Sequence, residues 1–129
     1  MAEEDFKSFE EFWPHYVAEH SRTGTRALHA VGTLVGTGLL VALAARGKWK
    51  MLPLALLPGY GAAWIGHFLV ERNRPATFRH PLWSFVGDYK MLGFVLTGRM
   101  QEEIARLHPG GIKPREEADR GIAERVESA

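Results

Sequence analysis

The chain has 129 residues, a formal net charge of +1 and 24% charged residues. Its basic residues are scattered along the sequence, which excludes the dense positive patch typical of a nucleic-acid-binding protein. Cysteine is absent, so disulfides and thiolate metal sites are excluded, and other side chains must hold any metal.

The first predicted element is a helix in the stretch FKSFEEFWPHYVAEH, from Phe6 to His20. Ser8 and Glu11 have the spacing of a capping box, which indicates a helix start, and Pro14 predicts a kink. The apolar side chains recur at helical spacing and predict one face, formed by Phe6, Phe9, Phe12, Trp13, Tyr16 and Val17. We expect this face to pack on the two membrane spans that follow or to lie among lipid headgroups.

Two uncharged segments follow, and each is long enough to cross a membrane. No Lys, Arg, Asp or Glu occurs between Ala27 and Ala45 or between Met51 and Val70. A helix of about 20 residues rises about 30 Å, which matches the hydrocarbon core of a bilayer. The acidic residues before the first span are unlike the basic start of a secretory signal. We therefore expect this span not to be cleaved off but to remain in the mature protein. The short loop RGKWK makes the second span return antiparallel, which predicts a helical hairpin.

Both spans carry small residues at helical spacing. Gly32 and Gly36 lie four apart in the first span, and the second span has a face formed by Gly59, Ala62, Ala63 and Gly66. Small residues let helix backbones approach closely. The simplest use of these faces is pairing of the two spans within one chain, and formation of a homo-oligomer through the same faces is the alternative.

The prolines of RNRPATFRHP end the second span. The next segment, LWSFVGDYKMLGFVLTG, is divided by Asp88 and Lys90, so it predicts an amphipathic helix at the membrane interface, with a short third span as the alternative. HPGGIKP is then a hinge, and residues 115–129 are a charged, helical or disordered segment. The predicted fold class is all-α, a small integral membrane protein with a membrane domain at 1–100, spans at about 27–45 and 51–70, and a polar C-terminal tail at 101–129.

The polar residues of the predicted hairpin gather at one end. His29 lies near the start of the first span and His67 near the end of the second, so antiparallel pairing brings them to the same membrane depth. Glu71 lies one turn beyond His67 on the same helix face, and His20 immediately precedes the first span. Each of these residues alone is explained by a hydrogen bond at the headgroups or by solvation. Together they suggest a metal site, because imidazole and carboxylate are the ligands of non-haem Fe(II), Zn and Mn.

The other three histidines are expected to have different roles. His15 lies in the aromatic N-terminal helix and is predicted to be a surface or packing residue. His80 and His108 stand beside prolines in predicted loops. Only His80 is retained, as a weak fourth candidate ligand.

Two blocks of this sequence resemble the signature blocks of the 2-hydroxy fatty acid dioxygenase (Mpo-like) family. They are EHSRTGTRALHAVGT and WIGHFLVERNRPATF, and the similarity to the bacterial branch of the family extends over about Phe6 to Gly98. The first block contains His20 and His29. The second follows the pattern G-H-x-x-x-E-x-x-R-P-A, formed here by Gly66, His67, Glu71, Arg74, Pro75 and Ala76.

The resemblance implies an Fe(II)-dependent dioxygenase that shortens a 2-hydroxy fatty acid by one carbon in α-oxidation. In that interpretation His20, His29 and His67 bind Fe(II), and Glu71 completes the site or orients His67 through a hydrogen bond. A 2-hydroxy acid would chelate the iron beside an open position for dioxygen. Arg74, or Arg72, would offer a planar pair of donors to the substrate carboxylate. A location in the bacterial inner membrane, with the lipid substrate in the bilayer, is also implied.

Two other functions are alternatives. His29 and His67 would be the axial ligands of a b-type haem between the spans, which predicts a Soret band. A metal-free membrane scaffold, in which the histidines only make hydrogen bonds, predicts no stoichiometric metal. For the topology, five basic residues at one end of the hairpin against three at the other favour cytoplasmic termini under the positive-inside rule. The five are Arg22, Arg26, Arg72, Arg74 and Arg79, and the three are Arg46, Lys48 and Lys50.

Overall fold

A computed structural model describes residues 6–75 and 79–112, and every regular element in this part of the chain is helical. The predicted all-α fold class is therefore confirmed. The C-terminal segment predicted at 115–129 lies outside the described residues. In chain order the elements are α1 (Phe9–Glu19), α2 (Thr23–Ala45), the 3-10 helix η1 (Trp49–Ala55), α3 (Leu56–Ile65), the π-helix η2 (Gly66–Glu71), α4 (Pro81–Leu96) and α5 (Met100–Leu107).

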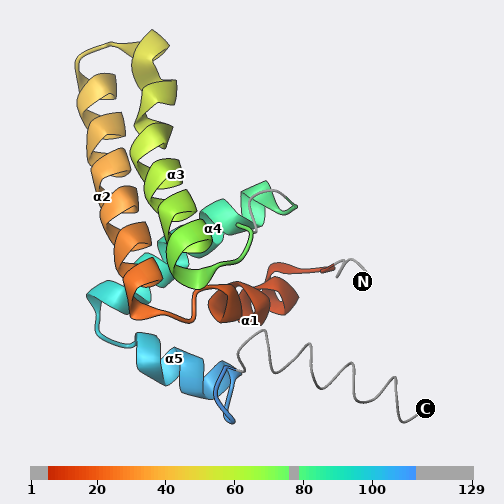
Figure 1. Cartoon of the computed structure of the whole chain (residues 1–129). Coiled ribbons are helices and arrows are strands. Elements are labelled where there is room, and N and C mark those ends of the chain that lie inside the picture. The colour runs from red at the N-terminus through yellow and green to blue at the C-terminus, as the bar shows by residue number, and fades with distance from the viewer. Residues whose placement is uncertain (1–5, 76–78, 113–129) are drawn as a thin grey trace.

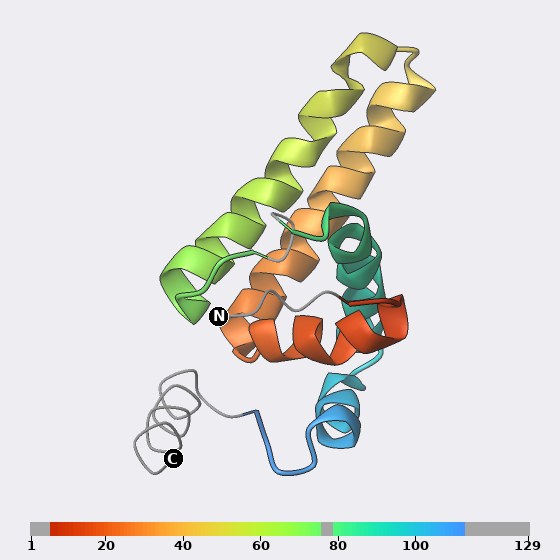
Figure 2. The same cartoon turned by 90° about the vertical axis from the view of Figure 1, so that its right-hand side faces the viewer.

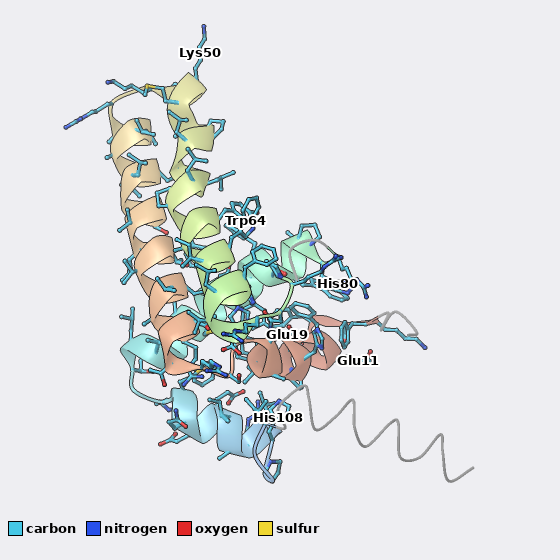
Figure 3. All side chains as sticks on the ribbon, in the orientation of Figure 1. Glu11, Glu19, Lys50, Trp64, His80 and His108 are labelled. Carbon is cyan, nitrogen blue, oxygen red and sulfur yellow. The ribbon has the colours of Figure 1, made fainter. Side chains whose placement is uncertain are left out.

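The hairpin predicted from the two uncharged segments is the longest feature of the molecule (Figure 1). Its first arm is α2, and η1, α3 and η2 follow one another directly to form the second arm, Trp49–Glu71. Both arms are 23 residues long and apolar enough to cross a membrane. The first arm begins before the predicted span and ends with it at Ala45, whereas the second arm extends beyond the predicted span at both ends. Lys50 marks the tip of the hairpin, far from the other helices (Figure 3).

Small residues allow the two arms to approach closely. A Cβ atom on Gly32 would lie 2.9 Å from the carbonyl oxygen of Pro58, and a Cβ on Gly36 would lie 2.9 Å from that of Ala55. Contacts this short are not tolerated by a side chain, so glycine is required at both positions. The small-residue face of the first span is thus used for pairing within one chain.

The remaining helices gather around the base of the hairpin, where α1 and α4 cross its axis (Figure 2). Their core consists of Phe12, Trp13, Tyr16, Val17, Met91 and Met100. Its aromatic half comes from the stripe predicted on the N-terminal helix. The cap expected at Ser8 is present, because its hydroxyl oxygen accepts a hydrogen bond from the Glu11 backbone N–H at 3.2 Å. Helix α1 continues through Pro14 to Glu19.

Helix α5 has no counterpart among the elements expected from the sequence. Its residues belong to the end of the predicted membrane domain and to the predicted polar tail. It is amphipathic, with Met100 buried in the core and Ile104 packed against it. The indole N–H of Trp13 donates to the Glu103 carboxylate at 2.9 Å, which ties α5 to α1. The segment just after Gly98 is therefore part of the folded base.

Candidate metal centre

Three histidines from three different elements meet at the base of the hairpin. His20 is the C-terminal cap of α1, His29 lies in α2 and His67 lies in η2. Their exposed fractions are 1%, 4% and 2%, and one ligand nitrogen from each ring lies within 4.8 Å of the other two. The cluster lies at the junction of the hairpin and α1, where Glu19, the residue before His20, is labelled in Figure 3. The structure therefore brings together the three histidines that the sequence predicts.

Hydrogen bonds to the outer nitrogen fix the tautomer of two of these rings. His20 Nδ1 lies 2.7 Å from the carbonyl oxygen of Tyr16, and His29 Nδ1 lies 2.9 Å from that of Thr25. A carbonyl oxygen only accepts, so each Nδ1 must carry the proton and donate it. The Nε2 atom of each ring is consequently an unprotonated lone-pair donor.

Asn73 fixes the third ring. Its side-chain amide donates to the backbone oxygen of Glu19 at 3.0 Å and to the Glu19 carboxylate at 2.6 Å. These two acceptors orient the amide, so its oxygen faces His67 Nδ1 at 2.7 Å and accepts from it. Arg72 makes this contact possible, because its left-handed backbone (φ 60°) ends the helix and turns the chain back toward His67.

We expect Asn73→Ala to weaken metal binding about 10- to 100-fold, as loss of a partner that orients a ligating histidine typically does. Titration of metal into the detergent-purified variant measures the change. Leu69→Ala is the matched control, since Leu69 lies in the same π-helix and is exposed. Equal affinity for the Asn73 variant and the parent would contradict the role assigned to the amide.

Three converging lone pairs require a positive partner. His20 Nε2 and His29 Nε2 are 3.1 Å apart, and neither carries a proton to share. Burial, reinforced by the nearby His29 and His67, holds the pKa of His20 well below its usual value, so a charged imidazolium does not relieve the repulsion. Two nitrogens each about 2.1 Å from one ion stand roughly 3.0–3.4 Å apart at ordinary coordination angles. The spacing of His20 and His29 therefore fits two ligands of one metal ion, and the ligand nitrogen of His67 lies within 4.8 Å of both.

Glu71, predicted to complete the site or to orient His67, contacts other groups. Its carboxylate accepts from the Ser21 hydroxyl at 2.7 Å and from the backbone N–H of Arg22. The negative charge thus lies at the N-terminus of α2, where the helix dipole favours it. The buried Arg26 guanidinium donates to the backbone oxygens of His20 and Ser21 at 2.8 and 2.7 Å. Together these contacts hold the turn that carries His20.

The remaining sequence candidates lie apart from the three histidines. Arg74 is exposed, and its neighbour Pro75 is buried. His80 precedes α4 and stacks on Trp83, with ring centroids 5.3 Å apart. Neither Arg74 nor His80 belongs to the metal-binding group found among the described residues. Ala76 of the second signature block lies outside the described residues.

His15 and His108 occupy peripheral positions. His15 lies 3.9 Å from the Glu19 carboxylate, one turn along α1. His108 Nε2 donates to the backbone oxygen of Pro14 at 3.0 Å and so joins the end of α5 to α1. These contacts agree with the packing role expected for His15.

A cavity of about 130 Å³ begins at the three histidines and runs between α2, α3 and α4. Its walls away from the histidines are largely apolar or small, and include Gly32, Gly36, Leu40, Ala55, Leu56, Gly59 and Ala63. A porphyrin ring surrounds its iron in one plane, and that plane must be free of side chains. Three imidazoles that converge on one point fit a single metal ion better than a haem. The geometry therefore does not favour the haem alternative.

The cavity also contains polar residues that sequence reasoning did not identify as functional. Tyr16, Ser84 and Asp88 all line it. The Tyr16 ring stacks on His20 with centroids 4.1 Å apart, and its hydroxyl donates to Asp88. Burial raises the pKa of Asp88 to about 6. The one available signal was the spacing of Ser84 and Asp88, which places them on one face of α4.

Comparison with known proteins assigns the family. Residues 6–100 match the family model described as 2-hydroxy-palmitic acid dioxygenase Mpo1-like, which covers most of the chain and all three histidines. No curated protein and no solved structure matches significantly. The chain belongs to the family of 2-hydroxy-palmitic acid dioxygenase Mpo1-like proteins.

Proposed function

We propose that the protein is a membrane-embedded, Fe(II)-dependent dioxygenase that shortens 2-hydroxy fatty acids by one carbon. The observation that carries this proposal is the convergence of three unprotonated Nε2 atoms at one end of an apolar cavity. The converging nitrogens suit a divalent metal, and the apolar cavity suits an acyl chain. The description of the family supplies the reaction class.

His20, His29 and His67 would hold the iron. Imidazole ligands suit zinc, copper, iron and nickel alike, but zinc has no redox chemistry, so a dioxygenase needs one of the others. Bound Fe(II) would supply redox chemistry and open positions at which dioxygen and the 2-hydroxy acid are activated. Glu71 acts by holding the turn that carries His20, and we assign Arg74 to attraction of the substrate carboxylate at the surface beside Pro75.

The overall reaction balances without a further reactant. One 2-hydroxy acid and one dioxygen give the acid one carbon shorter, carbon dioxide and water. The bond between the carboxyl carbon and C2 breaks, and C2 is oxidised from an alcohol to a carboxyl group. Dioxygen accepts all the electrons released, so no external reductant is consumed.

The decisive experiment is anaerobic reconstitution of the detergent-purified protein with Fe(II), followed by addition of 2-hydroxypalmitic acid and then air. We expect stoichiometric iron and a product one carbon shorter by mass spectrometry. The same acid without its hydroxyl should remain intact. A parent protein that holds no iron and leaves several chain lengths of 2-hydroxy acid unchanged would instead favour the scaffold function.

The exposed surface of the hairpin supports its place in a membrane. Only 28% of the most apolar part of the first arm and 17% of that of the second are buried inside the chain, unlike the core helix of a soluble protein. The exposed side chains include Val31, Val35, Val41, Leu57, Ile65 and Leu69. Lipid would cover these residues, and the acyl chain of a substrate would reach the cavity from the same phase.

We expect the base of the hairpin, and with it both ends of the chain, to face the cytoplasm of a bacterial cell. The reason is the excess of arginine at the base over the basic residues near the tip, where Lys50 lies (Figure 3). Fusion of a compartment-specific reporter after Ala129 tests this orientation. A reporter that is active only in the periplasm would show that the orientation is the opposite of the one expected.

A further inference from the structure

One face of α4 presents two polar side chains to the cavity that holds the three histidines. Ser84 and Asp88 are four residues apart and both line this cavity. Ser84 is only 3% exposed, and its hydroxyl has no hydrogen-bond partner in the described part of the chain. Burial of a hydroxyl without a hydrogen-bond partner is unfavourable. Such a group at a cavity wall is available to a ligand.

Asp88 is held beside the histidines through Tyr16. The Tyr16 hydroxyl donates to Asp88 Oδ1, while the ring of Tyr16 stacks on His20. Gly87 lets α4 lie directly on this ring, since a Cβ there would come within 3.0 Å of it. The position of the carboxylate relative to the metal centre is therefore fixed by packing.

These two side chains complement the head of a 2-hydroxy acid. Its carboxylate only accepts hydrogen bonds, whereas its 2-hydroxyl can donate one. We propose that Ser84 donates to the substrate carboxylate while Asp88 accepts from the 2-hydroxyl, so that this face of α4 recognises the 2-hydroxy acid head group. This inference rests on the proposed function and adds specificity-determining residues to it.

The arrangement also explains how a fatty acid without the hydroxyl would be rejected. Such an acid leaves Asp88 with the Tyr16 hydroxyl as a donor but without the second donor that the 2-hydroxyl would supply. The lost hydrogen bond to a charged group should lower the affinity roughly 10- to 100-fold. Chelation by the metal would favour the 2-hydroxy acid as well. The experiment must therefore separate a preference due to α4 from one due to the ion.

Binding to the anaerobic, Fe(II)-loaded protein gives this separation, because no turnover occurs without dioxygen. We measure the dissociation constants of 2-hydroxypalmitic and palmitic acid for the parent, Ser84→Ala and Asp88→Asn. We expect Asp88→Asn to reduce the preference for the hydroxy acid about 10-fold or more. Ser84→Ala should weaken binding of both acids, since both carry the carboxylate.

Folding and metal content distinguish recognition from a structural role. Ser84→Ala removes a hydroxyl that has no partner among the described residues, and the amide oxygen of Asp88→Asn still accepts from Tyr16. Both variants should therefore keep their melting temperature and iron stoichiometry. Thr97→Ala is the control, because it removes a hydroxyl from the end of the same helix, outside the cavity. A parent that does not bind 2-hydroxypalmitic acid refutes the proposed function. A parent that binds it, with unchanged affinity and preference in both variants, refutes only the inference about Ser84 and Asp88.

Discussion

Replacement of any one of His20, His29 and His67 with Ala is expected to abolish stoichiometric iron binding and the dioxygen-dependent loss of 2-hydroxypalmitic acid. Each ring contributes one of three converging ligand nitrogens, and the hydrogen bonds to Nδ1 leave Nε2 for this role. Loss of one ligand should cost more than the roughly 10- to 100-fold that loss of an outer hydrogen-bond partner costs. Metal analysis of the purified variants, together with mass spectrometry of the product, measures both effects.

His108→Ala is the best matched control for these variants. Its ring contacts the backbone of Pro14 and lies outside the metal-binding group of the described residues. His15 is less suitable, because it lies 3.9 Å from Glu19, whose carboxylate helps to hold Asn73. Circular dichroism confirms that each variant is folded. Full iron occupancy in a variant lacking His20, His29 or His67 would show that the replaced residue is not a metal ligand.

Gly36→Leu is expected to destabilise the hairpin by at least about 1–3 kcal/mol, the usual cost of overpacking a close contact. The new Cβ alone would lie 2.9 Å from the backbone oxygen of Ala55, so the two arms must separate. Gly66→Leu should also reduce iron occupancy, since a Cβ there would lie 3.0 Å from Thr25 and 3.6 Å from His29 Nδ1. Thermal unfolding in one detergent, followed by metal analysis, tests both variants.

Gly38→Leu provides the comparison, because a Cβ at Gly38 has no neighbour within 4 Å and faces outward from the same helix. It should unfold at the temperature of the parent or above, since leucine favours helix more than glycine does. If Gly36→Leu and Gly38→Leu unfold at the same temperature, close packing of the arms does not stabilise the protein.

The sequence predicts the hairpin well because its signals are local. Uncharged segments of sufficient length, one short loop and small residues at four-residue spacing together determine an antiparallel pair, and the pair brings His29 and His67 to one end. The sequence does not clearly predict helix α5, because polar residues dominate its composition. Met100, Ile104 and Leu107 nevertheless have the spacing of an apolar face.

The surroundings of the histidines depend on contacts that no local pattern contains. Glu71 has the correct spacing to orient His67, yet Asn73 makes that contact because the left-handed Arg72 reverses the chain. From the sequence alone, Asp88 is expected only to be a polar residue that divides an amphipathic helix. Its place in the cavity depends on how α4 crosses the hairpin and on the ring of Tyr16, which lies far away in the sequence.

The order of these parts along the chain has a consequence for biosynthesis. The three histidines and Asn73 all precede α4, whereas Ser84 and Asp88 belong to it. A growing chain therefore completes the three proposed metal ligands before it has made the helix that forms one wall of the cavity. Under the proposed function, this order would allow an ion to be loaded while the site is still open to water, and a fatty acid to be retained only after α4 has docked.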